Sequence, residues 1–431
     1  MGLKLEDKKI TQLRVAKGVS RQDLAAAIFS SVDNINKVEK GLTQYSDDQL
    51  RHAKIFFDIE DMPLSEFECA TARERLYVMR DYARGNRLEE AIVICEEMAK
   101  LVNLEPCDNE LPMLYRSLEI TVLIIAGKYD VAEEKLNYLQ GRWGDLAAVH
   151  RYYFYRNMGQ LNARRGKYEE GLKYYEMALD LYESSENGFQ DCNEMLHYGL
   201  AYCCTYLEYP YRAVYHLIKI RENYSGRRTA QISLWYDNIL AFNYIKAGII
   251  KESSKLLNNG LMRAKSIKND VFTGAVMRNL GLLHKKTENW KEAIKWFDQA
   301  MSTSTKDSNI YLSALYHKII CLAESKQFSK ASELLDKSHS LYCANKVFLP
   351  LFESLFHYIK VRNRISVYND QSVKDLETKA IPHLIKNHDH FLAIDYYKLL
   401  ELYYEGKNNK KSLLASKEIR RIYERCLMYQ R

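Results

Sequence analysis

The chain has 431 residues, of which 47% are hydrophobic and 28% charged, a balance typical of a folded globular protein and not of a disordered one. A net charge of +7 is spread over 63 basic and 56 acidic residues, so charge alone does not indicate binding to nucleic acid. Only 18 Gly and 6 Pro predict few turns and long helices, in two or three domains or in one small domain and a solenoid.

The sequence also limits the cellular setting. Its nine cysteines show no C-x-x-C spacing, which predicts reduced, mostly buried thiols. The stretch "MGLKLEDKKI" carries charges where a signal peptide would have an apolar core. The longest apolar stretch, around "ITVLIIAG" at residues 120–127, is too short to cross a bilayer. We therefore expect a cytoplasmic protein with no membrane partner.

Residues 8–57 contain four or five short helical patterns. "KKITQLRVAK" is amphipathic, and Ser20 and Ser31 each stand at the start of a further helix. The helix after Ser31 ends at Gly41, and Ser46 starts "DDQLRHAKIFF". The positions expected to face inward are Ile10, Leu13, Val15 or Ala16, Leu24, Ala25, Ile28, Ile35 and Val38.

A specific pattern runs through these helices. L-R-x-x-x-G-[VL]-S-x-x-x-L-A, followed by S-x-x-x-I-x-x-[IV]-E-x-G, is matched from Leu13 to Gly41 without a gap. The match resembles the lambda-repressor-like (Xre-type) helix-turn-helix family. The resemblance implies that the helix after Ser31 enters the major groove of a double-stranded DNA operator. It also implies that Arg14 and Glu39 pair with one another and brace the scaffold.

Side chains that point away from Ile35 and Val38 would then face bases and phosphates. Asn can bond adenine, Val can touch a thymine methyl, and Lys can reach guanine or phosphate. Arg21 stands where the family usually has a Gln near the DNA backbone. The residues expected to bind DNA are Arg21, Ser31, Val32, Asp33, Asn34, Asn36 and Lys37.

Two residues depart from the family pattern. Phe29 replaces the small residue expected in the tight turn, and Asp33 places a negative charge on the reading helix. Residues 1–60 hold ten Lys or Arg and nine Asp or Glu, so non-specific DNA binding should be weak. The alternative is a helical cap on the rest of the chain that does not contact DNA.

A repeat of about forty residues follows. "NMGQLNARRGKYEEGLKYYEMALDLY" (157–182) aligns without gaps with "NLGLLHKKTENWKEAIKWFDQAMSTS" (279–304). Both resemble the tetratricopeptide repeat, in which small residues allow two antiparallel helices to approach and bulky ones fill the adjoining holes. The small-residue position recurs at intervals of 38 to 42 residues, at Ala91, Ala132, Gly171, Ala213, Ser253, Ala293 and Ala331.

The repeat defines the predicted domains. We expect an all-α protein with a helix-turn-helix domain at residues 1–65 and a tetratricopeptide solenoid at 66–431. The solenoid should be right-handed, with about seven clear repeats and about two degenerate hairpins beyond residue 350, where the repeat pattern fades. The segment "DIEDMPLSEFE" (58–68) is the expected hinge, because Pro63 limits a continuous helix.

The first helix of each tetratricopeptide repeat lines the concave face, where such solenoids bind peptides. In this chain those helices offer aromatic, amide and basic side chains, which suit a short extended peptide with a carboxylate. The 33 tyrosines fit such a surface, since each has an apolar ring and a polar tip. The residues expected to bind peptide are Arg156, Gln160, Tyr198, Tyr202, Trp235, Asn238, Phe242, Arg278 and Asn279.

An Xre-type reader before a long tetratricopeptide solenoid resembles the RRNPP-type peptide-pheromone receptors, and among them the DNA-binding quorum-sensing regulators. "WYDNILAFNYIKAG" and "VMRNLGLLHKK" resemble inner helices that carry peptide-gripping Asn residues in that family. The resemblance assigns this role to Asn238 and Asn279, and more weakly to Asn157 and Asn243. It implies a homodimer whose operator binding changes when a short signalling peptide binds.

Other functions remain open. No phosphate loop, nucleophile elbow or metal-ligand spacing marks an enzyme, and "HLIKNHDHF" (383–391) does not place its histidines on one helix face, so we expect no catalytic site, metal or cofactor. The alternative is a protein-interaction module with a non-DNA-binding cap. Such a module could sequester response regulators or have Rap-like phosphatase activity, as some family members do.

Overall fold

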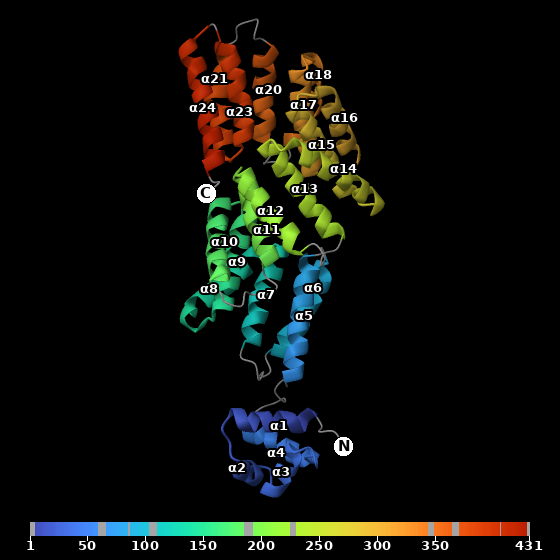
Figure 1. Cartoon of the computed structure of the whole chain (residues 1–431), viewed down its shortest axis with the longest axis vertical. Helices are drawn as coiled ribbons and strands as arrows, with labels where there is room; N and C mark the ends of the chain where they lie inside the picture. The colour runs from blue at the N-terminus through green and yellow to red at the C-terminus, as the bar shows by residue number, and fades with distance from the viewer. Residues whose placement is uncertain are drawn as a thin grey trace. The chain divides into compact units, whose positions relative to one another are not determined.

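A computed structural model describes residues 5–58, 66–84, 87–102, 110–184, 193–224, 230–343, 349–363, 370–405 and 407–428. Within these ranges every regular element is helical, which confirms the all-α prediction (Figure 1). The chain divides into two compact units. Unit 1 comprises Met1–Gly166 and Lys173–Phe189, and unit 2 comprises Lys167–Leu172 and Gln190–Arg431.

Unit 1 begins with four short helices that share a core of their own. They are α1 (Leu5–Ala16), α2 (Arg21–Ala27), α3 (Val32–Glu39) and α4 (Asp47–Phe57) (Figure 1). Seven of the positions predicted to face inward are buried in this core. Val15 and Ala16 are both exposed, so the prediction is wrong there, and the buried face of α1 runs through Ile10 and Leu13. Residues 59–65, which hold most of the predicted hinge and the predicted domain boundary, lie outside the described residues.

Serine caps set where these helices start. Ser20, Ser31 and Ser46 each accept a hydrogen bond from the backbone N–H three residues on, as the sequence predicts. Such a bond satisfies one of the N–H groups that the first turn of a helix leaves without a partner. At Ser46 the side chain of Gln49 also accepts from the Ser46 backbone N–H, which completes a capping box.

The remaining helices follow one another in the predicted repeat. In unit 1 and across its boundary with unit 2 they are α5 (Glu66–Arg84), α6 (Leu88–Val102), α7 (Leu111–Ile125), α8 (Tyr129–Gly141), a 3-10 turn (Trp143–Asp145), α9 (Ala148–Arg164) and α10 (Tyr168–Glu183). Unit 2 continues with α11 (Asn193–Tyr206), α12 (Pro210–Tyr224), α13 (Ala230–Ala247), α14 (Ile250–Ser266), α15 (Asp270–Lys286), α16 (Trp290–Ser302), α17 (Asn309–Glu324) and α18 (Phe328–Lys337).

The C-terminal part of unit 2 is also helical. It comprises α19 (His339–Cys343), α20 (Leu349–Asn363), α21 (Asp370–Asp375), a π-helical turn (Leu376–Ala380), α22 (Ile381–Lys386), α23 (His390–Tyr404) and α24 (Asn409–Met428). Figure 1 shows α20, α21, α23 and α24 side by side. Among the described helices, none is both long and apolar enough to traverse a membrane.

One turn geometry marks every repeat from α7 onward. All seven small residues of the predicted pattern are buried in the second helix of their hairpin. Five residues before each of the last six stands a residue with positive φ, which reverses the chain between the two helices. These residues are Gly127, Gly166, Glu208, Gly248, Glu288 and Lys326.

The same geometry recurs where the sequence pattern fades. His388 has φ +62° and stands five residues before Ala393, which is fully buried in α23. The turn between α22 and α23 is therefore built like the others. The sequence alone did not reveal it because Ile381 stands at the glycine position of the repeat and His390 at its first aromatic position, and only the second aromatic position is matched, by Tyr397.

The glycines of the two aligned repeats each face an aromatic ring. A Cβ on Gly159 would lie 2.8 Å from Cγ of Tyr175, and a Cβ on Gly281 would overlap the ring of Phe297 more closely still. Phe297 is fully buried. Glycine is thus required where the first helix of the hairpin meets the ring from the second.

We expect Gly281→Ala to lower the free energy of unfolding. Overpacking costs about 1–3 kcal/mol, and the better helix propensity of Ala returns up to about 1 kcal/mol. Urea unfolding measures the difference. Gly141→Ala is the matched control, because its Cβ would meet nothing within 4 Å. Phe297→Leu in the Gly281→Ala background should recover part of the loss. A Gly281→Ala protein as stable as wild type would contradict the packing argument.

A pair of buried histidines joins α11 to α12. Nδ1 of His197 and Nδ1 of His216 lie 3.0 Å apart, so one ring donates a hydrogen bond to the other. Burial, helped by the charge of Lys219, lowers the pKa of His197 to about 4. Burial, with His197 and Arg212, lowers the pKa of His216 to about 3. Both rings are neutral at neutral pH.

These histidines should make the protein sensitive to acid. Their pKa values lie below the ordinary 6.5, so the unfolded chain binds more protons and the free energy of unfolding falls as the pH drops from 6.5 towards 4. His216→Gln keeps a hydrogen-bonding group but removes one titrating group. Between pH 6.5 and 4 the free energy of unfolding of this variant should fall by about 2 kcal/mol less than that of wild type. Denaturant unfolding at several pH values tests this. The exposed His339→Gln is the control and should follow wild type. Parallel curves for all three proteins would exclude the effect.

Candidate functional site

Glu39 of α3 forms ion pairs with both α1 and α2 of the predicted helix-turn-helix domain. Its Oε1 lies 2.6 Å from Nε of Arg14, which confirms the predicted brace, and its Oε2 lies 2.7 Å from Nε of Arg21. Burial acts to raise the pKa of Glu39, but the hydrogen bonds from the two arginines outweigh it and hold the pKa below the usual value. Arg21, expected near a DNA backbone, is thus half-exposed and anchored to α3.

The exposed face of α3 carries the other residues predicted to bind DNA. Ile35 and Val38 are fully buried on the opposite face. Asp33 pairs with Lys37, Oδ2 to Nζ 2.6 Å, so the acidic residue that departs from the family pattern is neutralised within its own helix. Val32 is 42% exposed, and Ser31 caps the helix.

The two asparagines of α3 differ. Nδ2 of Asn34 donates to Oγ of Ser30 at 2.9 Å, so this side chain helps to fix the turn before the helix. The Asn36 amide makes no side-chain hydrogen bond within the described part of the chain. Asn36 is therefore the better placed of the two to reach a base edge.

Phe29 occupies the turn between α2 and α3 in the left-handed conformation, with φ +53°, where a glycine would be expected. Its ring is 80% exposed and meets His52 edge-on, with ring centroids 4.9 Å apart. Phe29 in this turn therefore strains the backbone but does not disturb the core, because its bulky ring points away from the core.

Arg156 and Gln160, the predicted peptide residues of α9, belong to unit 1. Arg156 is almost fully buried and donates through Nη2 to Oγ1 of Thr121 at 2.6 Å and to Oδ1 of Asn157 at 3.2 Å. Nδ2 of Asn157 donates to the Ser117 carbonyl at 2.8 Å. These bonds give Arg156 and Asn157 partners that join α9 to α7. Gln160 is half-buried.

The predicted aromatic residues of unit 2 form a stripe along one face of α11, which we call the tyrosine stripe. Tyr198, Tyr202 and Tyr206 follow at intervals of four, and the rings of Tyr202 and Tyr206 have centroids 4.8 Å apart. Tyr168 stacks on Tyr206 at 4.5 Å. Burial raises the pKa of Tyr168 to about 12. The stripe offers stacked apolar faces together with neutral hydroxyls.

On α13, Trp235 continues the tyrosine stripe. Its Nε1 donates to the Tyr198 hydroxyl at 3.2 Å, and its ring is 38% exposed. Asn238 and Phe242 stand three and seven residues further along and so share its helix face. Asn279 on α15 is fully buried, and its Nδ2 donates to Oδ1 of Asn238 at 2.8 Å.

This amide pair orients Asn238. Because Oδ1 of Asn238 accepts from Asn279, its Nδ2 is left as a donor, and no hydrogen bond from this nitrogen occurs among the described residues. Asn279 thus fixes the orientation of the Asn238 amide, and the Asn238 Nδ2 stays without a partner among the described residues. The weaker candidate Asn243 is fully buried, and its Nδ2 donates to Oγ1 of Thr205 at 2.8 Å.

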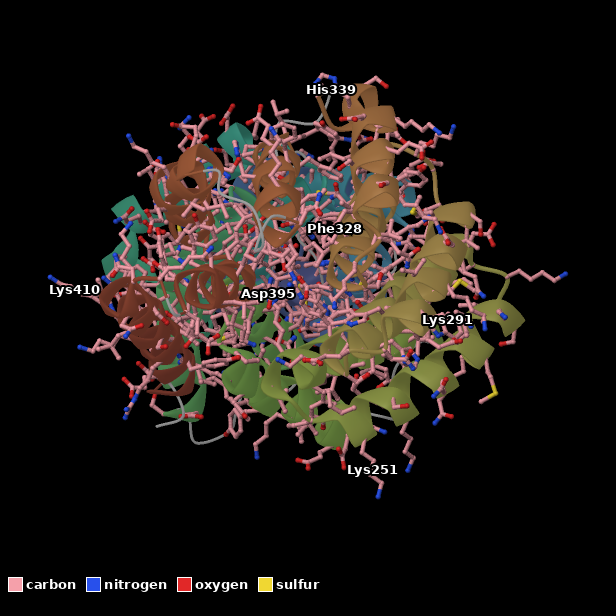
Figure 2. The ribbon with its side chains drawn as sticks, turned by 90° about the horizontal axis from the view of Figure 1, so that it is seen from above. Lys251, Lys291, Phe328, His339, Asp395 and Lys410 are labelled. Carbon is pink, nitrogen blue, oxygen red and sulfur yellow. The ribbon has the colours of Figure 1, made fainter. Side chains whose placement is uncertain are left out.

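A second group of charged residues joins α13 to the turn between α11 and α12, and α15 to α23. Lys246 pairs with Glu208, Nζ to Oε1 2.9 Å, and Lys285 pairs with Asp395 at 3.0 Å. Figure 2 labels Asp395 near the middle of the view, whereas Lys251 and Lys410 lie at its edge. Arg278 belongs to the same face, with Cζ 5.5 Å from the centroid of Phe242. We call Phe242, Lys246, Arg278 and Lys285 the inner-face cluster.

Glu208 has a further role at this face. Its Oε2 accepts a hydrogen bond from the backbone N–H of Phe391 at 2.6 Å, so the turn before α12 holds the first residues of α23. Burial, together with the Glu208 carboxylate, raises the pKa of Asp389 to about 6, and Lys246 opposes this rise.

Two other features of unit 2 lie apart from these residues. A hollow of about 680 Å³ is lined by residues of α16, α17 and α18, among them Lys291, Lys318 and Lys330, and contains none of the predicted site residues. Within the described ranges, no three His, Cys, Asp or Glu side chains are placed to hold a metal ion.

The sequence is similar to known proteins in two ways. A tetratricopeptide repeat family matches residues 273–306, which covers α15 and α16. The transcriptional activator NprA of Geobacillus stearothermophilus is 24% identical over 296 residues, which is 64% of this chain and 68% of NprA.

Solved structures share the solenoid. A Rap protein complexed with competence and sporulation factor matches 83% of this chain and 99% of its own, with a TM-score of 0.64 and 14% identity. NprR in complex with its cognate peptide NprX matches 82% of this chain and 99% of the NprR chain, with a TM-score of 0.62 and 18% identity. The apo form of NprR from B. thuringiensis matches 82% of this chain and 98% of the NprR chain, with a TM-score of 0.63 and 17% identity.

These likenesses confirm the tetratricopeptide-type solenoid predicted from the forty-residue repeat. The chain shares its solenoid fold with Rap and NprR, and its sequence is similar to that of the transcriptional activator NprA. Together these two likenesses confirm the resemblance to the RRNPP-type receptors.

Proposed function

We propose that this protein is a transcriptional regulator that binds a short signalling peptide and thereby changes its binding to an operator. The observation that carries the proposal is the free Asn238 donor, fixed by Asn279 between Trp235 and Phe242. An extended peptide presents main-chain carbonyls that such a donor can bind, with its side chains against the aromatic rings. The similarity to NprA and the fold shared with the NprR–NprX complex support it.

The regulatory step follows from the proposed arrangement. A peptide can change operator binding only if it has different affinities for two arrangements of the protein. One α3 helix covers too few base pairs for a specific operator, so a homodimer would place two of them on adjacent half-sites. The protein would act in the cytoplasm, where operator and imported peptide meet.

We expect Asn238→Ala to weaken peptide binding at least tenfold. A lost hydrogen bond of about 1.5 kcal/mol corresponds to roughly that factor. The probe is the best fluorescein-labelled heptapeptide recovered by affinity selection from a synthetic library, and fluorescence polarisation measures its dissociation constant. Asn258→Ala is the control, because Asn258 is an exposed amide of α14 bonded only within its own helix. Equal affinities for Asn238→Ala and wild type would remove Asn238 from the site.

We expect the full-length protein to enrich a palindromic sequence from random duplex DNA at low salt. Asn36→Ala should then weaken binding to that sequence about tenfold or more, because a bidentate contact to a base contributes about 1–3 kcal/mol. Mobility shift measures the affinity. Lys8→Ala removes an exposed charge on α1 and should affect selected and unselected DNA alike. Recovery of no common sequence would oppose the operator proposal.

A second candidate is a module that binds response regulators, as a Rap-like protein would. The Rap solenoid matches this chain over 83% of its length, and the near-neutral composition of residues 1–60 favours a cap that does not contact DNA. Under this alternative the protein would select no DNA sequence, yet the peptide affinity of Asn238→Ala would still be reduced. The two measurements above therefore separate the candidates.

A further inference from the structure

Arg278 differs from its neighbours in the inner-face cluster. Lys246 has Glu208 at 2.9 Å, and Lys285 has Asp395 at 3.0 Å. Arg278 forms no ion pair with any acidic residue in the described part of the chain, and its Nε is buried without a hydrogen-bond partner. The Phe242 ring, 5.5 Å from its Cζ, supplies only a cation–π contact.

Arg278 is half-buried, and a guanidinium that is partly removed from water without an ion-pair partner is costly. Burial lowers the pKa of Arg278 to about 10, with Tyr206 acting in the opposite direction, so the group is still charged at neutral pH. A charge removed from water is tolerated when an anion and hydrogen bonds replace the lost solvation. The described residues give Arg278 no anion as a partner and leave its Nε without a hydrogen bond. A bound group could therefore supply the anion next to Arg278.

A carboxylate is the anion that best fits the Arg278 guanidinium. A guanidinium presents parallel N–H groups that fit the two oxygens of a carboxylate. The adjacent lysines are already paired, so one positive charge is free, which suits a monoanion better than a phosphate dianion. Phe242, which lies beside Arg278, stands one helical turn from Asn238 on α13. A carboxylate there would be close to the proposed main-chain contact.

We propose that Arg278 binds a carboxylate of the peptide, and so selects peptides that carry an acidic group at one fixed position. This inference rests on the proposed peptide-binding function. The carboxylate is either the C-terminal group or the side chain of an Asp or Glu. Arg278 would then set specificity, while Asn238 holds the main chain whatever the peptide sequence.

The test compares three synthetic heptapeptide libraries in affinity selection on the full-length protein. One has all residues and a free C-terminus, one has an amidated C-terminus, and one lacks Asp and Glu. We expect wild type to select strongly from the first library and at least tenfold less from one of the other two. Loss with the amidated library assigns the C-terminal carboxylate, and loss with the acid-free library assigns a side chain.

Variants of the protein complete the test. Arg278→Gln should abolish the preference for the acidic group, and Arg278→Lys should retain only part of it, because an ammonium lacks the parallel donors. Arg263→Gln is the matched control, since Arg263 on α14 pairs with Asp237 at 2.9 Å and should leave the preference unchanged. A double-mutant cycle between Arg278→Gln and the neutralised peptide should show the two losses to be non-additive.

The peptide arm keeps the test valid if Arg278→Gln folds poorly, because neutralising the peptide needs no change in the protein. Peptides selected equally from all three libraries would overturn the Arg278 inference and leave the peptide-receptor proposal standing. Additive losses in the cycle would also overturn it. Selection of no peptide from any library would overturn the proposed function itself, and the Arg278 inference with it.

Discussion

The close approach of two helices at one small residue is the constraint on which the rest of the structure depends. Ala213, Ala293 and Ala331 have no exposed surface, and Phe297 fills the space beside Gly281. Because each hairpin is fixed in this way, its first helix presents the same face in every repeat. The tyrosine stripe, the amide pair and the inner-face cluster all stand on such first helices, so their chemistry depends on this packing.

Much of this arrangement could be predicted from local sequence. The serines at positions 20, 31 and 46 mark helix starts because capping depends on neighbours three residues away. The small residues mark the hairpins because their spacing repeats. The role expected for Asn238 follows from its place on the inner face of the repeat together with the family resemblance, and Trp235 and Phe242 share that helix face.

The partners of these residues could not be predicted. Asn238 and Asn279 are 41 residues apart, and the sequence does not say which of the two amides keeps a free donor. The ion pair of Lys285 depends on where α23 lies, and that of Lys246 depends on the turn between α11 and α12. The left-handed backbone conformation of Phe29 could not be predicted either, because phenylalanine rarely adopts a positive φ.

The bond between Glu208 and Phe391 has a consequence for how unit 2 unfolds. In a repeat protein whose hairpins touch only their neighbours, the ends can fray one hairpin at a time. Here a carboxylate at one turn holds a backbone N–H 183 residues away, and Lys285 holds Asp395 over 110 residues. These contacts close a loop of the chain, so opening any hairpin inside the loop is coupled to breaking them. We therefore expect the helices from α12 to α23 to unfold more cooperatively than those of an open solenoid.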